Sequence, residues 1–392
     1  MALGEIGGPA DWTPPSLLGG LAALLGESDG PSWVEVARGD QTEKFVELMN
    51  DLRRKFSATG DGKRITCCYA YMGVEPALAW ATACRDLMYP VMKQSIESFG
   101  ERWRSVRGDV GAVPCHYVSL GPGDGQKDGV ILEDLRRSFP HTSYIPVDAS
   151  TEMLRLAVRD LIVRLKLPQE NVLSLSWDFT AREHLVALRR LLDNVCGATP
   201  VLFSLLGNTI ANFDGDADLL GLLTTELLRP RDRLLLEVAT TPALTDELAC
   251  EAAEEYASSP TFGEFVTSAL RRYTDLHVDK DSVEFLGGVE DDRALMVKMV
   301  YRNRTGADIP ITLPNRAEVR FGEDDTIRLA LSRKYSAAGL EAMLSAGELS
   351  VLTDSRSRFA GNGPRFGLAL LMLAPAGEPP AVVTLADRVW SR

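Results

Sequence analysis

Three glycines at alternate positions follow a short apolar run. In "YVSLGPGDGQKDGVIL", Gly121, Gly123 and Gly125 stand between a stretch of strand length and a segment with helical spacing. Glycine tolerates backbone conformations that other residues avoid, and it lets a ligand approach the chain closely. A strand, a glycine-rich turn and a helix together direct backbone N–H groups beyond the strand's C-terminal end. The pattern predicts either a nucleotide-like ligand or a tight turn without one.

Two aspartates stand at the ends of the next predicted strands. "SYIPVD" ends in Asp148, and "NVLSLSWDF" places Asp178 just after the following strand. A carboxylate roughly 20–30 residues after the glycines can accept hydrogen bonds from a ribose diol. Asp178 can accept one from an adenine amino group. Each aspartate alone is more often a helix cap or loop residue, but together with the glycines they predict an adenosine site.

The spacing of the glycines favours a cofactor without phosphate. A dinucleotide fingerprint requires G-x-G-x-x-G, whereas this chain has "GPGDG", and Asp124 would repel a pyrophosphate. S-adenosylmethionine carries adenine, ribose, an amino acid tail and a sulfonium cation, which suit an acidic chain. The residues therefore favour methyl transfer over hydride transfer, with a nicotinamide-dependent oxidoreductase as an alternative.

The elements that must position these residues alternate along the chain. From about Val113, apolar runs of strand length ("CHYVSL", "SYIPVD", "NVLSLSWD", "PVLFSLLG", "DRLLLEVA") alternate with amphipathic segments such as "TEMLRLAVRDLIVRLK". This pattern predicts an α/β fold, a doubly wound parallel sheet with helices on both faces. Beyond Pro242 the pattern becomes α+β, and "SRKYSAAGLEAMLSAG" is predicted to be a helix. Two closing strands, "LSVLTDSRSRF" and "FGLALLMLAP", are then expected to form a hairpin.

Five regions follow from these patterns. We expect a Gly/Pro-rich extension at 1–40, a helical region at 41–110, a cofactor-binding Rossmann-like domain at 111–241, an inserted substrate domain at 242–328, and a return to the first sheet at 329–392.

Composition limits the classes of molecule that the protein is expected to bind. The 392 residues carry a formal charge of −13, which gives no electrostatic reason to expect nucleic acid or an anionic membrane as a partner. No apolar run reaches the length of a membrane span and no secretory signal is recognisable, so we expect a cytoplasmic protein acting on a small molecule. The six cysteines and four histidines lack metal-ligand spacing, so we expect reduced thiols and no metal site. Nothing here indicates an oligomeric state.

Several of these stretches also carry a family resemblance. In the same order, "YVSLGPGDGQKD", "YIPVDASTEML", "WDF", "LFSLLGNTIANFD" and "LSRKYS" resemble the motifs of the histidine-specific methyltransferase family. This family includes an enzyme of the ergothioneine pathway and, more distantly, dimethylallyltryptophan N-methyltransferase. The resemblance covers roughly Val118 to Pro375. It implies a class I methyltransferase fold with an inserted α+β substrate-binding domain, and S-adenosylmethionine as the cofactor.

The resemblance also implies roles for individual residues. Expected to contact the cofactor are Gly121, Gly123, Lys127, Asp148, Asp178 and Phe179. Expected on the substrate side are Tyr89, Asn212, Tyr256, Ala330 and Ser332. Of these, Asn212 and Tyr256 are expected to orient an attacking amine, since both can hydrogen-bond to it without acting as strong bases.

One departure from the family bears on the substrate. Two residues before the serine the family has a glutamate that meets imidazole, and this chain has Ala330. A buried ring N–H without an acceptor costs roughly 1–3 kcal/mol, so histidine is expected to be a poor substrate. We expect N-methylation of an amino acid, or of a specialised metabolite derived from one, with a less polar side chain. The alternatives are a non-catalytic binding protein and an O- or C-methyltransferase.

Overall fold

The centre of the molecule is a mostly parallel sheet. The structure, a computed structural model, describes residues 36–38, 42–86, 95–108, 110, 113–279, 282–358 and 366–377. Side by side lie β5 (Ser174–Ser176), β4 (Tyr144–Asp148), β3 (His116–Leu120), β6 (Val201–Leu205) and β7 (Arg233–Thr240), all parallel. A short strand β1 (Val36–Arg38) pairs with β5, and the hairpin of β13 (Leu349–Arg358) and β14 (Gly367–Pro375) closes the other side. Because β14 runs antiparallel to β7 and β13 antiparallel to β14, the one reversed strand on this side lies next to the edge, and β13 at the edge runs in the direction of the parallel strands.

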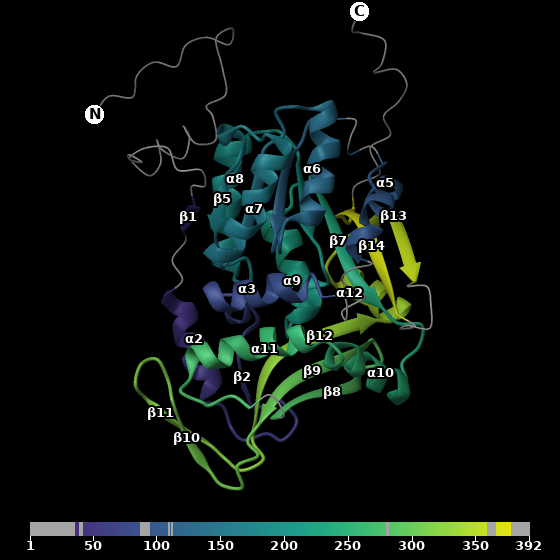
Figure 1. Cartoon of the computed structure of the whole chain (residues 1–392). Helices are drawn as coiled ribbons and strands as arrows, with labels where there is room; N and C mark the ends of the chain where they lie inside the picture. The colour runs from purple at the N-terminus through teal and green to yellow at the C-terminus, as the bar shows by residue number, and fades with distance from the viewer. Residues whose placement is uncertain are drawn as a thin grey trace, which may run out of the picture.

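Helices cover both faces of this sheet (Figure 1). One face carries α5 (Phe99–Val106), α6 (Gln126–Ser138) and α7 (Thr151–Leu165), and the other carries α8 (Arg182–Cys196), α9 (Asp216–Leu222) and α12 (Ala337–Ala346). Successive side chains of a strand point to opposite faces of the sheet, and this explains why helices pack on both faces. In β7, Leu234 and Leu236 belong to the core beneath α8 and α9, whereas Leu235 belongs to the core beneath α5 and α6.

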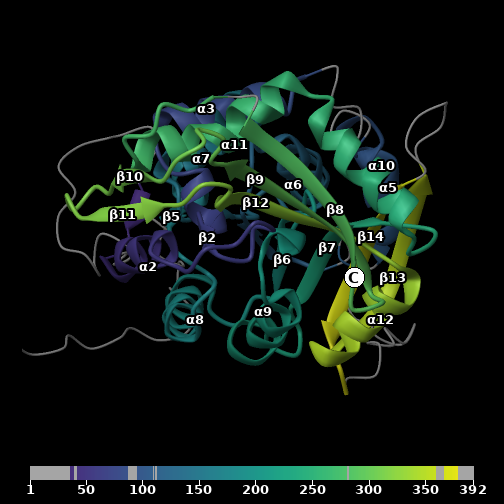
Figure 2. The same cartoon turned by 90° about the horizontal axis from the view of Figure 1, so that it is seen from below.

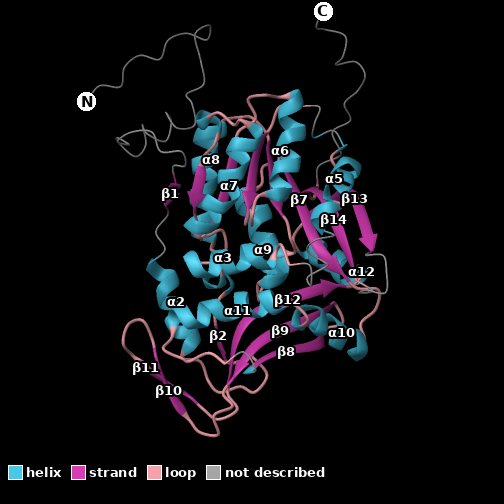
Figure 3. Ribbon diagram, viewed as in Figure 1, coloured by secondary structure: helices cyan, strands magenta, loops and turns pink. Residues whose placement is uncertain are grey.

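Between β7 and β12 (Thr326–Tyr335) the chain forms a second layer. It comprises α10 (Asp246–Ala257), α11 (Pro260–Tyr273), β8 (Val283–Glu290), β9 (Ala294–Arg302) and the hairpin β10 (Ile309–Thr312) and β11 (Glu318–Phe321). Strands β8, β9 and β12 are antiparallel, and β12 meets β7 at the single pair Tyr335 and Thr240. Figures 2 and 3 show α10 and α11 beside these strands, and the whole layer lies across the C-terminal ends of the parallel strands. The two layers are therefore joined by hydrogen bonds, and the boundaries of an inserted domain at 242–328 stay a prediction.

The start of the predicted helix "SRKYSAAGLEAMLSAG" is wrong. Ser332 to Tyr335 form the end of strand β12, and helix α12 begins only at Ala337. Ser336 marks the boundary, because its hydroxyl caps the helix by accepting a hydrogen bond from the Gly339 N–H at 3.0 Å. The sequence therefore contains a strand, "TIRLALSRKY", that the helical pattern concealed.

The N-terminal region joins the second layer. Helix α2 (Thr42–Leu52) is followed by turns and by β2 (Lys63–Arg64), which pairs with β12, and then by a 3-10 turn (Cys67–Ala70) and α3 (Val74–Ala83). The region expected to be helical from 41 is thus interrupted between residues 53 and 73. Helix α3 packs against α11. Among the described residues, no helix combines the length and apolar composition needed to cross a membrane.

Gly125 has a packing role at the start of α6. It precedes the helix with φ +77°, and a Cβ atom placed on it would lie 2.5 Å from the carbonyl oxygen of Ala157 in α7. A side chain here would force α6 and α7 apart, since backbone atoms cannot move aside as a flexible side chain can. The third glycine of the motif is therefore explained by helix packing.

We expect Gly125→Ala to lower the free energy of unfolding by about 2–4 kcal/mol. Roughly 1 kcal/mol comes from the positive φ and the rest from the contact with Ala157. Gly306→Ala is the matched control, because Gly306 has φ +75° and open space around it, so only the conformational cost of about 1 kcal/mol applies. Urea denaturation of both variants measures the difference, and equal losses would contradict the packing role.

Candidate functional site

A cavity lies at the C-terminal ends of β3, β4 and β5. It has a volume of about 1060 Å³, counted with its open mouth, and the turns that follow these three strands form its walls. A Cβ atom on Gly123 would meet nothing nearer than Trp80 Nε1 at 4.0 Å, and one on Gly121 nothing nearer than Thr209 Cγ2 at 3.5 Å. Both glycines have positive φ and both line the cavity. Their backbone is therefore open to close approach by a ligand.

Asp148 presents acceptor capacity to this cavity. One of its oxygens accepts a hydrogen bond from the Ser150 N–H at 2.8 Å, and its other oxygen has no partner in the described part of the chain. Burial in the cavity wall raises the pKa of the Asp148 carboxyl to about 7. A ligand with hydroxyl groups could donate hydrogen bonds to the oxygen of this carboxylate that has no partner.

Asp178 and Phe179 lie on the far side of the same cavity. One Asp178 oxygen accepts from the N–H and hydroxyl of Thr180 at 2.9 and 2.7 Å, so the residue also shapes its own turn. The ring of Phe179 meets that of Phe213 edge-to-face, with centroids 6.2 Å apart. Asp178 and Phe179 are both buried, and both line the cavity.

Lys127 is held by a carboxylate that the sequence analysis missed. Glu237, fully buried in the middle of β7, forms ion pairs with Lys127 and with Arg102 of α5, the latter at 2.6 Å. It also accepts a hydrogen bond from the Gly207 N–H at 2.7 Å. Burial acts to raise the pKa of Glu237, but Lys127 and Arg102 outweigh it and hold the pKa below its ordinary value. An acidic residue inside the apolar run "RLLLEVA" was the available signal.

This cluster carries an excess of positive charge. Two cations surround one carboxylate, and Lys127 lines the cavity while also donating to Ser95 Oγ at 2.6 Å. An ammonium group has three donors, so one remains for a ligand. The excess charge suits a carboxylate at this end of the cavity.

A second cavity of about 940 Å³ adjoins the first. The two share Cys67, Tyr71, Trp80, Gly207 and Asn212 as wall residues. Asn212 ends the 3-10 turn Thr209–Asn212, and its amide has no hydrogen-bond partner among the described residues. Its side chain is therefore available to a ligand at the point where the two cavities meet.

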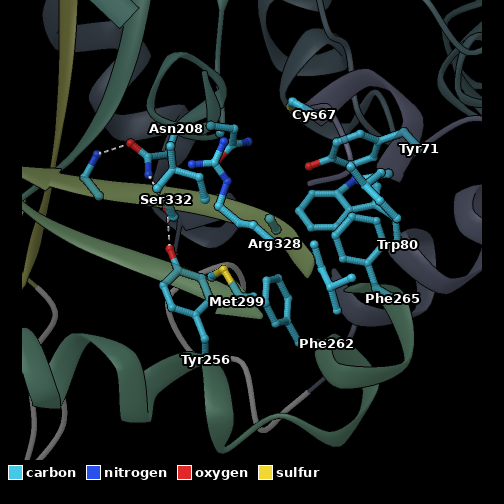
Figure 4. A pocket seen from close by; sticks show the side chains of 18 of the residues that line it. Cys67, Tyr71, Trp80, Asn208, Tyr256, Phe262, Phe265, Met299, Arg328 and Ser332 are labelled. Carbon is cyan, nitrogen blue, oxygen red and sulfur yellow. Dashed lines mark hydrogen bonds between the residues drawn. The ribbon is translucent and has the colours of Figure 1, made fainter. Parts of the chain in front are cut away.

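A chain of hydrogen bonds forms the polar side of the second cavity (Figure 4). The hydroxyls of Tyr256 and Ser332 lie 2.8 Å apart, and Asn208 Nδ2 donates to Ser332 Oγ at 3.2 Å. Asn208 in turn accepts from the Ala239 N–H at 2.8 Å and adopts φ +63°, a conformation that asparagine tolerates. Tyr256 and Ser332 were predicted, but Asn208, which ties them to β7, was not.

The opposite side of the second cavity is aromatic. Trp80 lies 5.4 Å from Tyr71 and 4.9 Å from Phe265 between ring centroids, and Phe262 lies 5.8 Å from Phe265. Sequence analysis missed all four residues. Their rings form a continuous cluster, as Figure 4 shows.

Ala330 lies in the wall of the second cavity, opposite Met299 in the register of β12 and β9. The register shifts between Arg328 and Ala330, as it does at a β-bulge, a feature often found beside binding sites. Tyr89, also predicted on the substrate side, lies outside the described residues. The remaining predicted residues all line one or both of the cavities.

Comparison with known proteins gives a family match over most of the chain. A family described as "Histidine-specific methyltransferase, SAM-dependent" matches residues 86–370. No curated protein matches the sequence.

The solved structures that match this chain include three methyltransferases of low sequence identity. An S-adenosylmethionine-dependent methyltransferase from Clostridium acetobutylicum is 14% identical, with 77% of this chain and 92% of that chain covered and a TM-score of 0.34. One from Anabaena variabilis is 11% identical, with 78% and 96% covered and a TM-score of 0.37. The 1,6-didemethyltoxoflavin-N1-methyltransferase of Burkholderia thailandensis is 9% identical, with 72% and 78% covered and a TM-score of 0.34.

The first cavity fits S-adenosylmethionine, the cofactor of this family. The open backbone of Gly121 and Gly123 and the acceptor capacity of Asp148 suit an adenosine with a free ribose diol. Asp178 and Phe179 would hold the adenine, and Lys127 the carboxylate of the amino acid tail. The second cavity meets this one at Asn212.

We expect the affinity for S-adenosylhomocysteine to fall as the pH is lowered through 7. Hydroxyl donors favour the ionised carboxylate, so binding lowers the pKa of Asp148 and releases a proton, and acid opposes this release. Between pH 8 and pH 6.5 the dissociation constant should rise about fourfold for a pKa near 7. Titration calorimetry at several pH values measures this dissociation constant. The range stays above the pKa of Asp128, which is about 6, so that titration of Asp128 contributes less to the result.

Asp148→Asn is the matched variant, because the amide keeps the shape of the carboxyl without its titration. Its affinity at pH 8 should be roughly ten- to hundredfold weaker and nearly independent of pH. An unchanged pH profile in this variant would remove Asp148 from the cofactor site.

Proposed function

Because this chain belongs to the family of histidine-specific, SAM-dependent methyltransferases, we propose that it N-methylates an amino acid, or a specialised metabolite derived from one. The side chain of this acceptor is less polar than that of histidine. The observation that carries the proposal is the second cavity, in which an aromatic cluster and Ala330 form the wall and which meets the cofactor cavity at Asn212.

The residues at the meeting point are suited to orienting an amine. When bound, S-adenosylmethionine supplies a methyl group activated by its sulfonium. Asn212 can accept a hydrogen bond from an amino group or donate one to a carboxylate, and its amide is not used by the protein. Tyr256 can position the amine through its hydroxyl, which Ser332 holds at 2.8 Å. Holding the nucleophile near the reacting carbon supplies much of the rate enhancement in such reactions.

The side-chain end of the acceptor is proposed to lie against Ala330, Met299 and the aromatic residues. Ala330 lacks the carboxylate that the family uses for imidazole, and the rings of Phe262 and Phe265 offer apolar surface. Each methylene group buried there would contribute about 0.8 kcal/mol. This environment supports an apolar or aromatic side chain over a polar ring.

A mass-spectrometric screen tests the proposal. Amino acids and amine metabolites are incubated with the protein and S-adenosylmethionine, and products that gain methyl groups are fragmented. Methylation at nitrogen of an apolar or aromatic amino acid supports the proposal. Methylation at oxygen or carbon contradicts the amine mechanism while leaving the family unaffected, and binding of S-adenosylhomocysteine without any turnover would favour a non-catalytic role.

We expect Asn212→Ala to reduce turnover at least tenfold while the affinity for S-adenosylhomocysteine changes less than about twofold. Loss of a hydrogen bond to the reacting group costs on the order of 1.5–3 kcal/mol, whereas the cofactor is held mainly by other residues. Asn315→Ala, in a surface turn, is the control for the asparagine replacement itself. Loss of cofactor binding in Asn212→Ala would contradict its assignment to the acceptor.

Wild-type protein is expected to prefer tryptophan, tyrosine or leucine over histidine when all four compete in one assay. Ala330→Glu should depress activity on the preferred acceptor at least tenfold, because it buries a carboxylate without a partner. Ala330→Gln has nearly the same volume without the charge and separates the two effects. A clear preference of the wild type for histidine would overturn the role given to position 330.

A further inference from the structure

We propose that Arg328 recognises a carboxylate on the methyl acceptor, so that the enzyme selects amines that are also acids. The inference rests on the proposed function, because it concerns the second cavity as the acceptor site. Arg328 lies on β12, two residues before Ala330, and lines this cavity. Figure 4 shows its side chain between the Asn208–Ser332 side and the aromatic side.

The guanidinium of Arg328 is only partly used by the protein. Its Nη2 donates to both carboxylate oxygens of Asp214 at 2.7 Å. Its Nε and Nη1 have no acceptor within the described part of the chain, and neither is among the polar atoms sealed from solvent. The side chain as a whole is 9% exposed, and it lines the second cavity.

The charges around Arg328 do not cancel. Asp214 pairs with both Arg328 and Arg64 at 2.7 Å, and Asp51 pairs with both Arg64 and Arg54 at 3.0 and 2.6 Å. This chain of contacts joins three arginines to two aspartates and leaves one positive charge over. Asp214 is also 49% exposed, so water weakens its hold on Arg328.

The other cation of the second cavity is neutralised. Lys334 Nζ lies 2.5 Å from Glu255, and the pair is buried. Among the described residues that line this cavity, Arg328 is therefore the cation whose charge no buried carboxylate balances, since its partner Asp214 is half-exposed and shared with Arg64. Glu237 also lines the second cavity, but it is already paired with Lys127 and Arg102 and so does not offset the charge of Arg328.

A carboxylate fits these donors. The planar fork of a guanidinium matches the two oxygens of a carboxylate, and the match is strongest where water is excluded. A neutral amide or ester at the same place would accept fewer hydrogen bonds and leave the charge uncompensated. We therefore infer that an acceptor without a free carboxylate binds poorly, even if its amine and side chain are suitable.

Binding of matched acids and amides to the protein saturated with S-adenosylhomocysteine tests the inference. The probes are indole-3-propionate, 3-phenylpropionate and 4-methylpentanoate, each compared with its primary amide by titration calorimetry. For at least one pair, the acid should bind the wild type ten- to hundredfold more tightly than the amide. If no acid binds better than its amide, the inference is overturned.

Substitutions at Arg328 test whether this residue causes the tighter binding of the acid. Arg328→Gln should abolish the preference for the acid, and Arg328→Lys should retain only part of it, because charge is kept but the fork is lost. The double variant Arg328→Gln with Asp214→Asn removes both partners and avoids a stranded aspartate, should the single variant fold poorly. Arg304→Gln, at an exposed pair with Glu284, is the control. A preference that survives in Arg328→Gln or in the double variant overturns the inference.

The same titrations separate this inference from the proposed function. If S-adenosylhomocysteine does not bind the wild type, the proposed function fails with it. If it binds normally and acids and amides bind alike, the role of Arg328 alone is overturned.

Discussion

The carboxylate of Glu237 is the contact on which both cavities depend. It is fully buried, and it joins β7 to α5 through Arg102, to α6 through Lys127, and to the turn after β6 through Gly207. Removing one partner of a buried pair typically costs about 3–5 kcal/mol, because the other charge is left without compensation. The glycine-rich turn, the helix behind it and the turn that carries Asn208 are therefore fixed relative to one another by a single side chain.

Strand β12 places the second cavity against this fixed core. It pairs with β9 along its length in the antiparallel layer and meets β7 of the parallel sheet only at its last residue, Tyr335. Asn208 reaches from the core to Ser332 and to the Arg333 carbonyl, and Tyr335 donates to Asp216 at 2.6 Å. The polar side of the second cavity is thus tied by hydrogen bonds to elements that form the first cavity.

The sequence predicted the cofactor side better than the acceptor side, and the reason is local geometry. Gly121, Asp148 and Asp178 each follow a strand of a parallel sheet, and such strand ends meet at one edge whatever the rest of the chain does. Glu237, Asn208 and Arg328 have their partners 110, 124 and 114 residues away, where no spacing rule applies. The residues "SRKY" were assigned to a helix because they precede one, and only pairing with β9 makes them a strand.

The shift of register in β12 has a further consequence. Ala330, just after the irregularity, is only partly buried and lines the second cavity. Position 330 can therefore change in size while Leu329 and Leu331 on either side stay in their buried places. A substitution at this position would therefore reshape the second cavity, while the residues that line the first cavity keep their places.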